Sequence, residues 1–134
     1  MEVERLQQLP LFAGLGKKER KRLAPLVEDL EVAEGRELAH EGDVAHEFFV
    51  IQEGTATVSQ GGSPIAELGP GDFFGEIALH DENRRRTSTV VASSPMRLAI
   101  ILGHDVRFIE RELPGIATEI RAATDARLAR DEQR

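Results

Sequence analysis

The first 28 residues carry apolar positions at helical spacing. A short helix is expected over residues 2–9, where Pro10 ends it, and a second short helix over 17–27. The apolar positions that we expect to face inward on these two helices are Val3, Leu6, Leu9, Leu23, Leu26 and Val27.

From residue 29 the pattern changes to short runs of strand length that turn residues separate. The runs recur every 8 to 12 residues, with Gly, Pro, Asp and Ser between them, as is typical of a compact antiparallel barrel or sandwich. They are DLEVAEG, ELAHEGD, EFFVIQEG, TATVSQGG, SPIAELGPGD, TSTVVASSP and MRLAIILG.

Two further details of this region can be predicted. The run over 96–103 alternates, so we expect a strand with one face fully buried, formed by Met96, Leu98, Ile100 and Leu102. The glycines between runs stand where tight turns need a positive φ, namely Gly35, Gly42, Gly54, Gly61, Gly62, Gly69 and Gly71.

After Gly103 the helical period returns. One short helix is expected over 104–113, Pro114 and Gly115 break it, and a longer helix follows over 116–134. No helix-turn-helix is seen after it, so we expect no direct contact with nucleic acid. The longer helix places Ile116, Ile120, Ala123 and Leu128 near one face and its charges opposite.

Composition narrows the class of protein. The 134 residues suggest one domain, and the net charge of -7 argues against general binding to nucleic acid or to an anionic membrane. Without cysteine the chain has neither disulfides nor thiolate chemistry. No apolar run approaches the ~20 residues of a membrane span, and the N-terminus lacks a signal-peptide pattern, so we expect a cytoplasmic protein. The basic cluster over 17–22 is interpreted as a solvated helix face.

The stretch FGEIALHDENRRRTSTV, residues 73–89, combines features that suit a phosphate ester of a sugar. Gly75 removes a side chain where close approach is needed, and the next residues can form one helical turn whose free N–H groups attract an anion. Glu76 would repel that anion unless it faces a neutral donor such as a sugar hydroxyl. An arginine from 84–86 could then neutralise the anion with a planar contact.

This stretch resembles the phosphate-binding cassette of cyclic nucleotide-binding domains, as found in kinase regulatory subunits, cyclic-nucleotide-gated channels and bacterial cAMP receptor proteins. The matching motifs are FGEIAL and RTSTV, and EGRELAHEGDVAHEFFVIQEGTATV and LFAGLGKKERKRLAPLVEDLEV resemble the family upstream. The resemblance covers roughly residues 9–128. It implies a mainly β fold with flanking α-helices, an eight-stranded antiparallel β-roll of jelly-roll type. As a single domain, residues 1–28 would form N-terminal helices, 29–103 the roll with its cassette at 73–90, and 104–134 a hinge and lid.

The resemblance also implies roles for individual residues. Glu76 would accept hydrogen bonds from the ribose 2′-hydroxyl, and backbone amides around Gly75 would meet the sugar and phosphate. Counting back from the closing valine assigns the cyclic phosphate to Arg86, with Arg85 as the alternative register. Arg84 and Arg85 are otherwise interpreted as a solvated loop. The ligand-binding residues implied in this way are Gly75, Glu76, Ile77, Ala78, Arg86, Thr87 and Ser88.

The resemblance implies a regulatory domain that binds cAMP or cGMP and changes the position of its C-terminal helix. We favour cAMP, and Thr124 and Arg127 are polar candidates for contacts between the lid and the base. The ligand would be the only small molecule, with no cofactor, no metal and no catalytic site. Expected partners are a regulated protein or fused effector, and a second copy paired through the C-terminal helix. A ligand-independent interaction module of the same fold remains the alternative.

Overall fold

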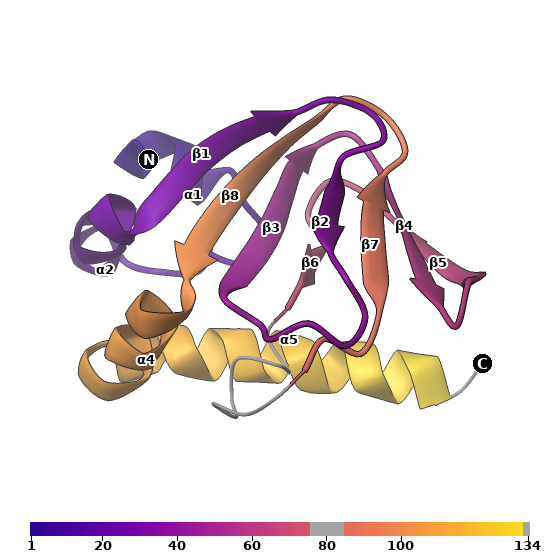
Figure 1. Cartoon of the computed structure of the whole chain (residues 1–134). Coiled ribbons are helices and arrows are strands. Elements are labelled where there is room, and N and C mark those ends of the chain that lie inside the picture. The colour runs from indigo at the N-terminus through magenta and orange to yellow at the C-terminus, as the bar shows by residue number, and fades with distance from the viewer. Residues whose placement is uncertain (76–84, 133–134) are drawn as a thin grey trace.

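The computed structural model describes the backbone of residues 1–75 and 85–132, and the side chains of residues 1–75 and 85–123. Short helices precede a set of strands, and two helices follow them (Figure 1). The elements are α1 (Val3–Gln7), α2 (Lys17–Leu23), the 3₁₀ helix η1 (Ala24–Leu26), β1 (Val27–Val32), β2 (Glu37–Ala39), β3 (Glu47–Glu53), β4 (Ala56–Gln60), β5 (Ser63–Leu68), β6 (Phe73–Phe74), β7 (Thr89–Ala92), β8 (Met96–Leu102), α4 (Gly103–Glu112) and α5 (Pro114–Glu132).

The described strands form two four-stranded sheets that face one another (Figure 1). The first sheet has the order β1-β8-β3-β6 and the second has the order β2-β7-β4-β5, and every pairing within them is antiparallel. Eight antiparallel strands with flanking helices confirm the predicted fold class. The strand β6 has only two residues, which is too short for any periodicity in the sequence to reveal.

The two central strands of the first sheet, β3 and β8, are buried on both of their faces. Because side chains alternate along a strand, β3 sends Phe48 and Val50 to one face and Phe49 and Ile51 to the other. The first pair lies in a core that the sheet shares with the helices, and the second pair lies in the core between the two sheets. The continuous apolar run in β3 therefore reflects a strand between two cores.

The strand β8 repeats this arrangement, and here the sequence interpretation was incomplete. Leu98 and Ile100 face the core of the roll, as expected, but Ala99 and Ile101 are also buried, at 1% and 0% exposure, beneath the helices. Leu102, expected on the buried face, is only half-buried because the chain turns into α4 directly after it. The predicted buried face is confirmed at Met96, Leu98 and Ile100, but the prediction left out the helical layer that buries the other face.

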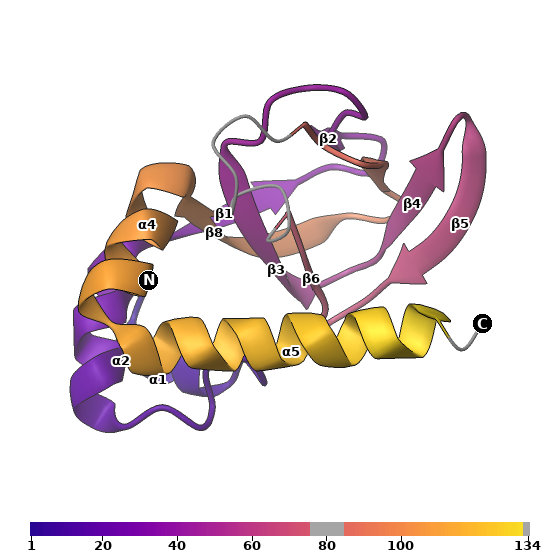
Figure 2. The ribbon, with the colours of Figure 1, turned by 90° about the horizontal axis from the view of Figure 1, so that it is seen from below.

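The helices cover one end and one side of the first sheet. Figure 2 shows α1, α2 and α4 gathered at one end and α5 running beneath the roll. Ile109, Leu113 and Ile116, around the junction of α4 and α5, are all 3% exposed or less. Ile120 is buried as expected, Ala123 packs against the same core, and Leu128 lies outside the described side chains. Along the described chain, no helix is both long enough and apolar enough to span a membrane.

Two local expectations need correction. The second helix does not continue to Val27, since Pro25 cannot donate to the helical ladder; the α-helix gives way to η1, and Val27 starts β1. Gly69 lacks a positive φ, because the left-handed residue of its turn is Gly71 at +90°. The side chain of Asp72 closes this turn by accepting from the Gly69 N–H at 2.8 Å. The other predicted glycines do have positive φ.

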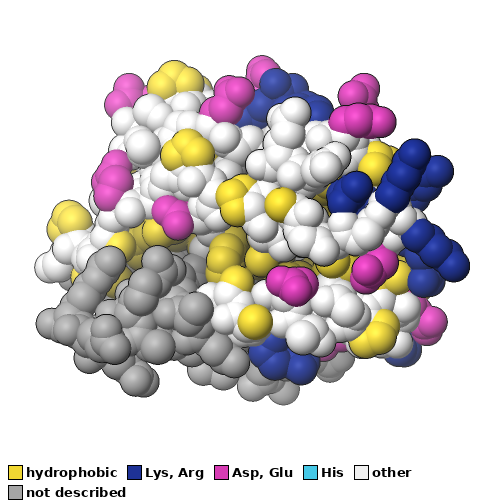
Figure 3. Space-filling model, turned by 180° about the vertical axis from the view of Figure 1, so that it is seen from behind, with side chains coloured by type: hydrophobic (Ala, Val, Ile, Leu, Met, Phe, Trp, Pro, Cys, Tyr) yellow, Lys and Arg dark blue, Asp and Glu magenta, His cyan; other side chains and the backbone are white. Residues whose placement is uncertain are grey.

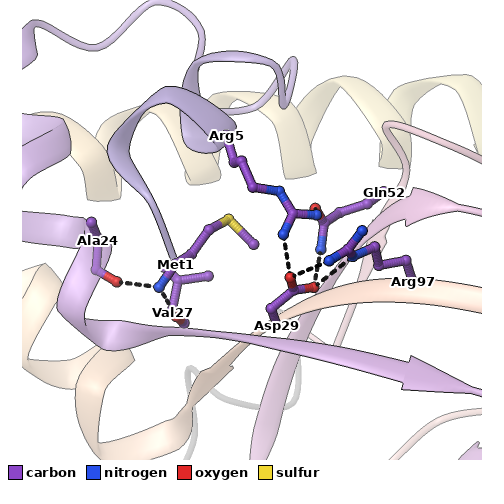
Figure 4. A network of polar contacts seen from close by, with 7 residues as sticks. All are labelled: Met1, Arg5, Ala24, Val27, Asp29, Gln52 and Arg97. Carbon is purple, nitrogen blue, oxygen red and sulfur yellow. Dashed lines mark hydrogen bonds and ion pairs between the residues drawn. The ribbon is translucent and has the colours of Figure 1, made fainter.

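A polar network on the edge of the first sheet attaches α1 to the strands (Figure 4). The carboxylate of Asp29, on β1, accepts from Arg5 of α1, from Gln52 of β3 at 3.0 Å, and from two nitrogens of Arg97 on β8 at 2.9 and 3.1 Å. Arg5 also donates to Gln52 at 2.9 Å, and nearby the Met1 amine donates to the backbone carbonyls of Ala24, in η1, and of Val27, at the start of β1. One carboxylate thus connects three strands and a helix.

This network predicts an acid-dependent loss of stability. Partial burial raises the pKa of Asp29, but hydrogen bonds from Arg97, Gln52 and Arg5 outweigh it, so this pKa lies below its usual value of 3.8. A lowered folded-state pKa stabilises the protein above the unfolded value, and this contribution is lost as the pH falls through the folded value. We expect Asp29→Asn to unfold more easily near neutral pH and to lose less stability between pH 5 and pH 3 than the parent. Urea unfolding over that range measures both effects.

The control for this prediction is Glu28→Gln on the same strand, whose exposed side chain makes no ion pair among the described residues. It should leave the neutral-pH stability and its acid dependence nearly unchanged. Equal acid profiles for Asp29→Asn and the parent would contradict the prediction.

Candidate functional site

The candidate site is built around the segment that contains Arg85 and Arg86. Both backbone groups of Arg86 bond to the loop between β2 and β3. The Arg86 N–H donates to the Asp43 carbonyl at 2.7 Å, and the Arg86 carbonyl accepts from the Gly42 N–H at 2.9 Å. Val44 and Arg85 form an isolated antiparallel bridge next to these bonds. The segment therefore enters β7 with a fixed orientation.

That orientation separates the two neighbouring arginines. Arg85 is exposed, and within the described part of the chain its guanidinium donates only to the Gly42 carbonyl, at 3.3 Å. Arg86 points inward and is 8% exposed, the one buried charged residue among the described side chains. Arg84 lies outside the described residues. Of the two described arginines in the cluster over residues 84–86, only Arg86 is buried.

Among the described residues, the Arg86 guanidinium has fewer hydrogen-bond partners than it has donors. Its Nη2 donates to the Glu47 carbonyl at 2.8 Å, and its Cζ lies 5.9 Å from the centre of the Phe49 ring. Its Nη1 is buried and has no hydrogen-bond partner in the described part of the chain. Burial lowers the pKa of Arg86, and the negative charge of Glu47 opposes that effect. A buried cationic donor without a partner is costly, so it marks a place suited to an anion.

Gly75 makes the position of Arg86 sterically possible. Its φ is +94°, and a Cβ at this residue would lie 2.5 Å from Arg86 Nη1 and 2.7 Å from the Glu47 carbonyl oxygen. Real Cβ atoms do not approach other atoms so closely. The space that a side chain would fill is occupied instead by the guanidinium, and only glycine satisfies both the backbone and the contact.

The residues just before Gly75 fix the start of the cassette. Phe73 pairs with Val50 and Phe74 with Phe49 in the ladder between β6 and β3. Phe73 faces the helical core, while Phe74 faces the core of the roll and stacks on Phe49 with ring centres 4.6 Å apart and planes 14° apart. These contacts hold Gly75 beside Arg86.

The other predicted site residues are placed less fully. Thr87 is exposed, and Ser88 is half-buried with its hydroxyl accepting from the Gln60 amide at 3.0 Å. Glu76, Ile77 and Ala78 lie outside the described residues. Thr124 and Arg127 lie in α5, but their side chains are not described.

Three residues at the site were missed by reasoning from sequence. Glu47 contributes a backbone carbonyl, which no residue type reveals, and Phe49 is indistinguishable from other apolar core positions. Gln60 supports Ser88 from the neighbouring strand β4, and nothing in its local sequence signals this. Each contact joins residues that are at least 28 positions apart.

The remaining charged clusters supply no competing site. Figure 3 shows Lys and Arg side chains gathered along the edge that the N-terminal helices occupy. In the basic cluster over residues 17–22, Arg20 donates to the Leu15 carbonyl. The other basic side chains, Lys17, Lys18, Lys21 and Arg22, are exposed, and their exposure agrees with a solvated helix face. Within the described ranges, no group of three His, Asp or Glu side chains could hold a metal ion.

Comparison with known proteins identifies the family to which this chain is similar. The cyclic nucleotide-binding domain model matches residues 29–111. A cAMP-dependent protein kinase regulatory subunit from Hypocrea atroviridis is 32% identical over 96 residues, which cover 72% of this chain and 21% of that protein. This chain therefore spans about a fifth of that relative's length.

Solved structures share the fold. The catabolite activator protein of Thermus thermophilus superposes with a TM-score of 0.79 at 26% identity, over 92% of this chain and 60% of that one. The regulatory domain of Toxoplasma gondii PKA, crystallised with cAMP, gives a TM-score of 0.76 at 19% identity, over 92% of this chain and 48% of that one. With a family model that matches more than half of its residues, the chain belongs to the cyclic nucleotide-binding domain family.

Proposed function

We propose that this chain is a regulatory domain in which a cyclic nucleotide binds with its phosphate on Arg86. The observation that carries the proposal is the buried Nη1 of Arg86, which lacks a partner among the described residues. A cyclic phosphate oxygen would accept from this nitrogen while Nη2 keeps its bond to Glu47. The alternative register fits less well, because Arg85 is exposed and has no desolvated donor to satisfy.

The remaining contacts follow from the order of residues along the cassette. Glu76 would accept from the ribose 2′-hydroxyl, and backbone amides at Gly75, Ile77 and Ala78 would donate to the sugar and phosphate. Thr87 and Ser88 directly follow the arginine and would donate to the phosphate or the base. The bond from Gln60 supports this role for Ser88, since it limits the rotation of the hydroxyl.

We propose cAMP as the preferred ligand, acting inside the cytoplasm. This is supported by the description of the 32% identical relative as a subunit of a cAMP-dependent kinase. Thr124 and Arg127 of α5 are the proposed contacts to the base.

The proposed output is a change in the position of α4 and α5. The N–H of Gly103, the first residue of α4, donates to the His46 carbonyl at 2.7 Å. The next residue, Glu47, supplies the carbonyl that Arg86 holds. A ligand that pulls on Arg86 therefore acts one peptide away from the start of α4, and a partner protein, a fused effector or a second copy would respond to the helices.

A thermal-shift panel of cAMP, cGMP, cyclic dinucleotides and AMP tests the proposal. Ligand at ~100 times its dissociation constant stabilises a folded protein by about 2.7 kcal/mol, so the melting temperature should rise by several degrees. We expect the largest rise with cAMP, a smaller one with cGMP and little with non-cyclic AMP. No rise with any nucleotide at millimolar concentration would contradict ligand binding and favour a ligand-independent interaction module.

A further inference from the structure

The Arg86 guanidinium needs support that a single hydrogen bond does not supply. Its only side-chain hydrogen bond in the described part of the chain joins Nη2 to the Glu47 carbonyl. One such bond fixes a distance but leaves the guanidinium plane free to rotate about it. Glu47 adds favourable charge but no second bond to the guanidinium. A further contact among the described residues is with the face of the Phe49 ring.

Phe49 offers a rigid aromatic surface. The residue is 2% exposed on the central strand β3, and its ring stacks on Phe74 at 4.6 Å with planes 14° apart. Phe74 belongs to β6, immediately before Gly75, so the ring pair, the glycine and the guanidinium are held together. The negative face of an aromatic ring attracts a guanidinium within about 6 Å, and more strongly where water is excluded.

We propose that Phe49 is a positioning residue for Arg86: its ring holds the guanidinium in the buried pose that leaves Nη1 available to the ligand. An apolar residue without a ring would fill much of the same volume but would not attract the charge. Without Phe49, Arg86 would sample poses directed toward solvent, and the ligand would bear the cost of ordering it. The effect on affinity rests on the proposed function, whereas the pose of Arg86 in the ligand-free protein does not.

Phe48 provides a matched control within the same strand. It is 1% exposed, and it also contacts a neighbouring ring, that of Phe73 at 5.9 Å, but it lies on the opposite face of the sheet, in the helical core. Phe48→Leu and Phe49→Leu therefore remove the same atoms from equally buried sites. Only the second change removes the ring beneath Arg86.

The first experiment uses the ligand-free protein. Side-chain NMR relaxation of the arginine Nε–H groups, with Arg86→Lys for assignment, should show an ordered Arg86 side chain with a high order parameter in the parent. We expect this order parameter to fall in Phe49→Leu and to be kept in Phe48→Leu. An Arg86 order parameter that is the same in the parent and in Phe49→Leu overturns the proposal. If Phe49→Leu does not fold, Phe49→Met, which keeps more volume without a ring face, replaces it.

The second experiment measures cAMP affinity by calorimetry. Loss of a desolvated cation–π contact should weaken binding roughly tenfold in Phe49→Leu, against less than about twofold in Phe48→Leu. Equal weakening in both variants would mean that Phe49 is only a core residue, and it would overturn the proposal. If the parent protein binds neither cAMP nor cGMP, the proposed function fails, and the NMR result alone still decides the role of Phe49.

Discussion

Arg86→Ala is expected to weaken cAMP binding by about 2–5 kcal/mol, because truncating one partner of a buried charged contact leaves the ligand phosphate unpaired in a desolvated site. The guanidinium that would meet the phosphate is buried, fixed through its backbone to the loop between β2 and β3, and has one nitrogen without a described partner. No other described cation is enclosed in this way and could replace it. Isothermal titration calorimetry with cAMP gives the loss directly.

Arg85→Ala is the matched control for this change. It removes the same side chain one residue earlier, from an exposed position where the guanidinium donates to a carbonyl at 3.3 Å. We expect a loss below about 0.5 kcal/mol, as for an ordinary surface substitution. Binding that survives Arg86→Ala but fails in Arg85→Ala would assign the phosphate to the other register. Circular dichroism of both variants separates a binding defect from misfolding.

Gly75→Ala should have the second-largest effect, on stability and binding together. The residue has φ +94°, where an L-residue costs roughly 1–2 kcal/mol, and the new Cβ would lie 2.7 Å from the backbone oxygen of Glu47 and 2.5 Å from Arg86 Nη1. The backbone must shift or the guanidinium must leave its place. We expect a total destabilisation of about 3 kcal/mol or more, and cAMP affinity reduced as in Arg86→Ala. Urea unfolding and calorimetry measure the two effects.

Gly62→Ala separates the steric effect from the backbone effect. Gly62 has a similar φ of +84° in the turn between β4 and β5, but nothing lies within 4 Å of the added Cβ. This variant should show only the strain of the left-handed backbone, about 1–2 kcal/mol, and unchanged binding. Similar losses of stability and affinity in the two variants would show that contact with Arg86 and Glu47 does not matter.

Much of the roll could be predicted from sequence because its signals are local. Alternation and turn glycines located seven of the eight described strands, whereas β6 exists only because Phe73 and Phe74 pair with β3. The burial of Ala99 and Ile101 was missed for a related reason. Their face of β8 is covered by helices that are distant in sequence or follow a turn. The residue types within one strand do not indicate that a second layer of structure covers it.

The candidate site, too, could be predicted from local sequence signals only in part. The motif spacing assigned the phosphate to Arg86 rather than Arg85, and the burial of Arg86 supports that assignment. The contacts that hold its guanidinium involve Glu47 and Phe49, which are 39 and 37 positions earlier in the chain. One acts through a backbone carbonyl and the other through a ring in an apolar run. Neither role depends on a local sequence pattern, so both can be recognised only in the folded structure.

The burial of β3 and β8 on both faces limits how the helices can respond to a ligand. Ile101 on β8 and Ile109, Leu113 and Ile116 around the α4–α5 junction share one core, each 3% exposed or less. Lifting the helices off the sheet would expose all of these side chains to water, at about 25 cal/mol for each Å² of apolar surface. Small sliding displacements would keep the core covered, so we expect any response to a ligand at the junction of α4 and α5 to be a shear along the sheet, with larger swings restricted to the far end of α5.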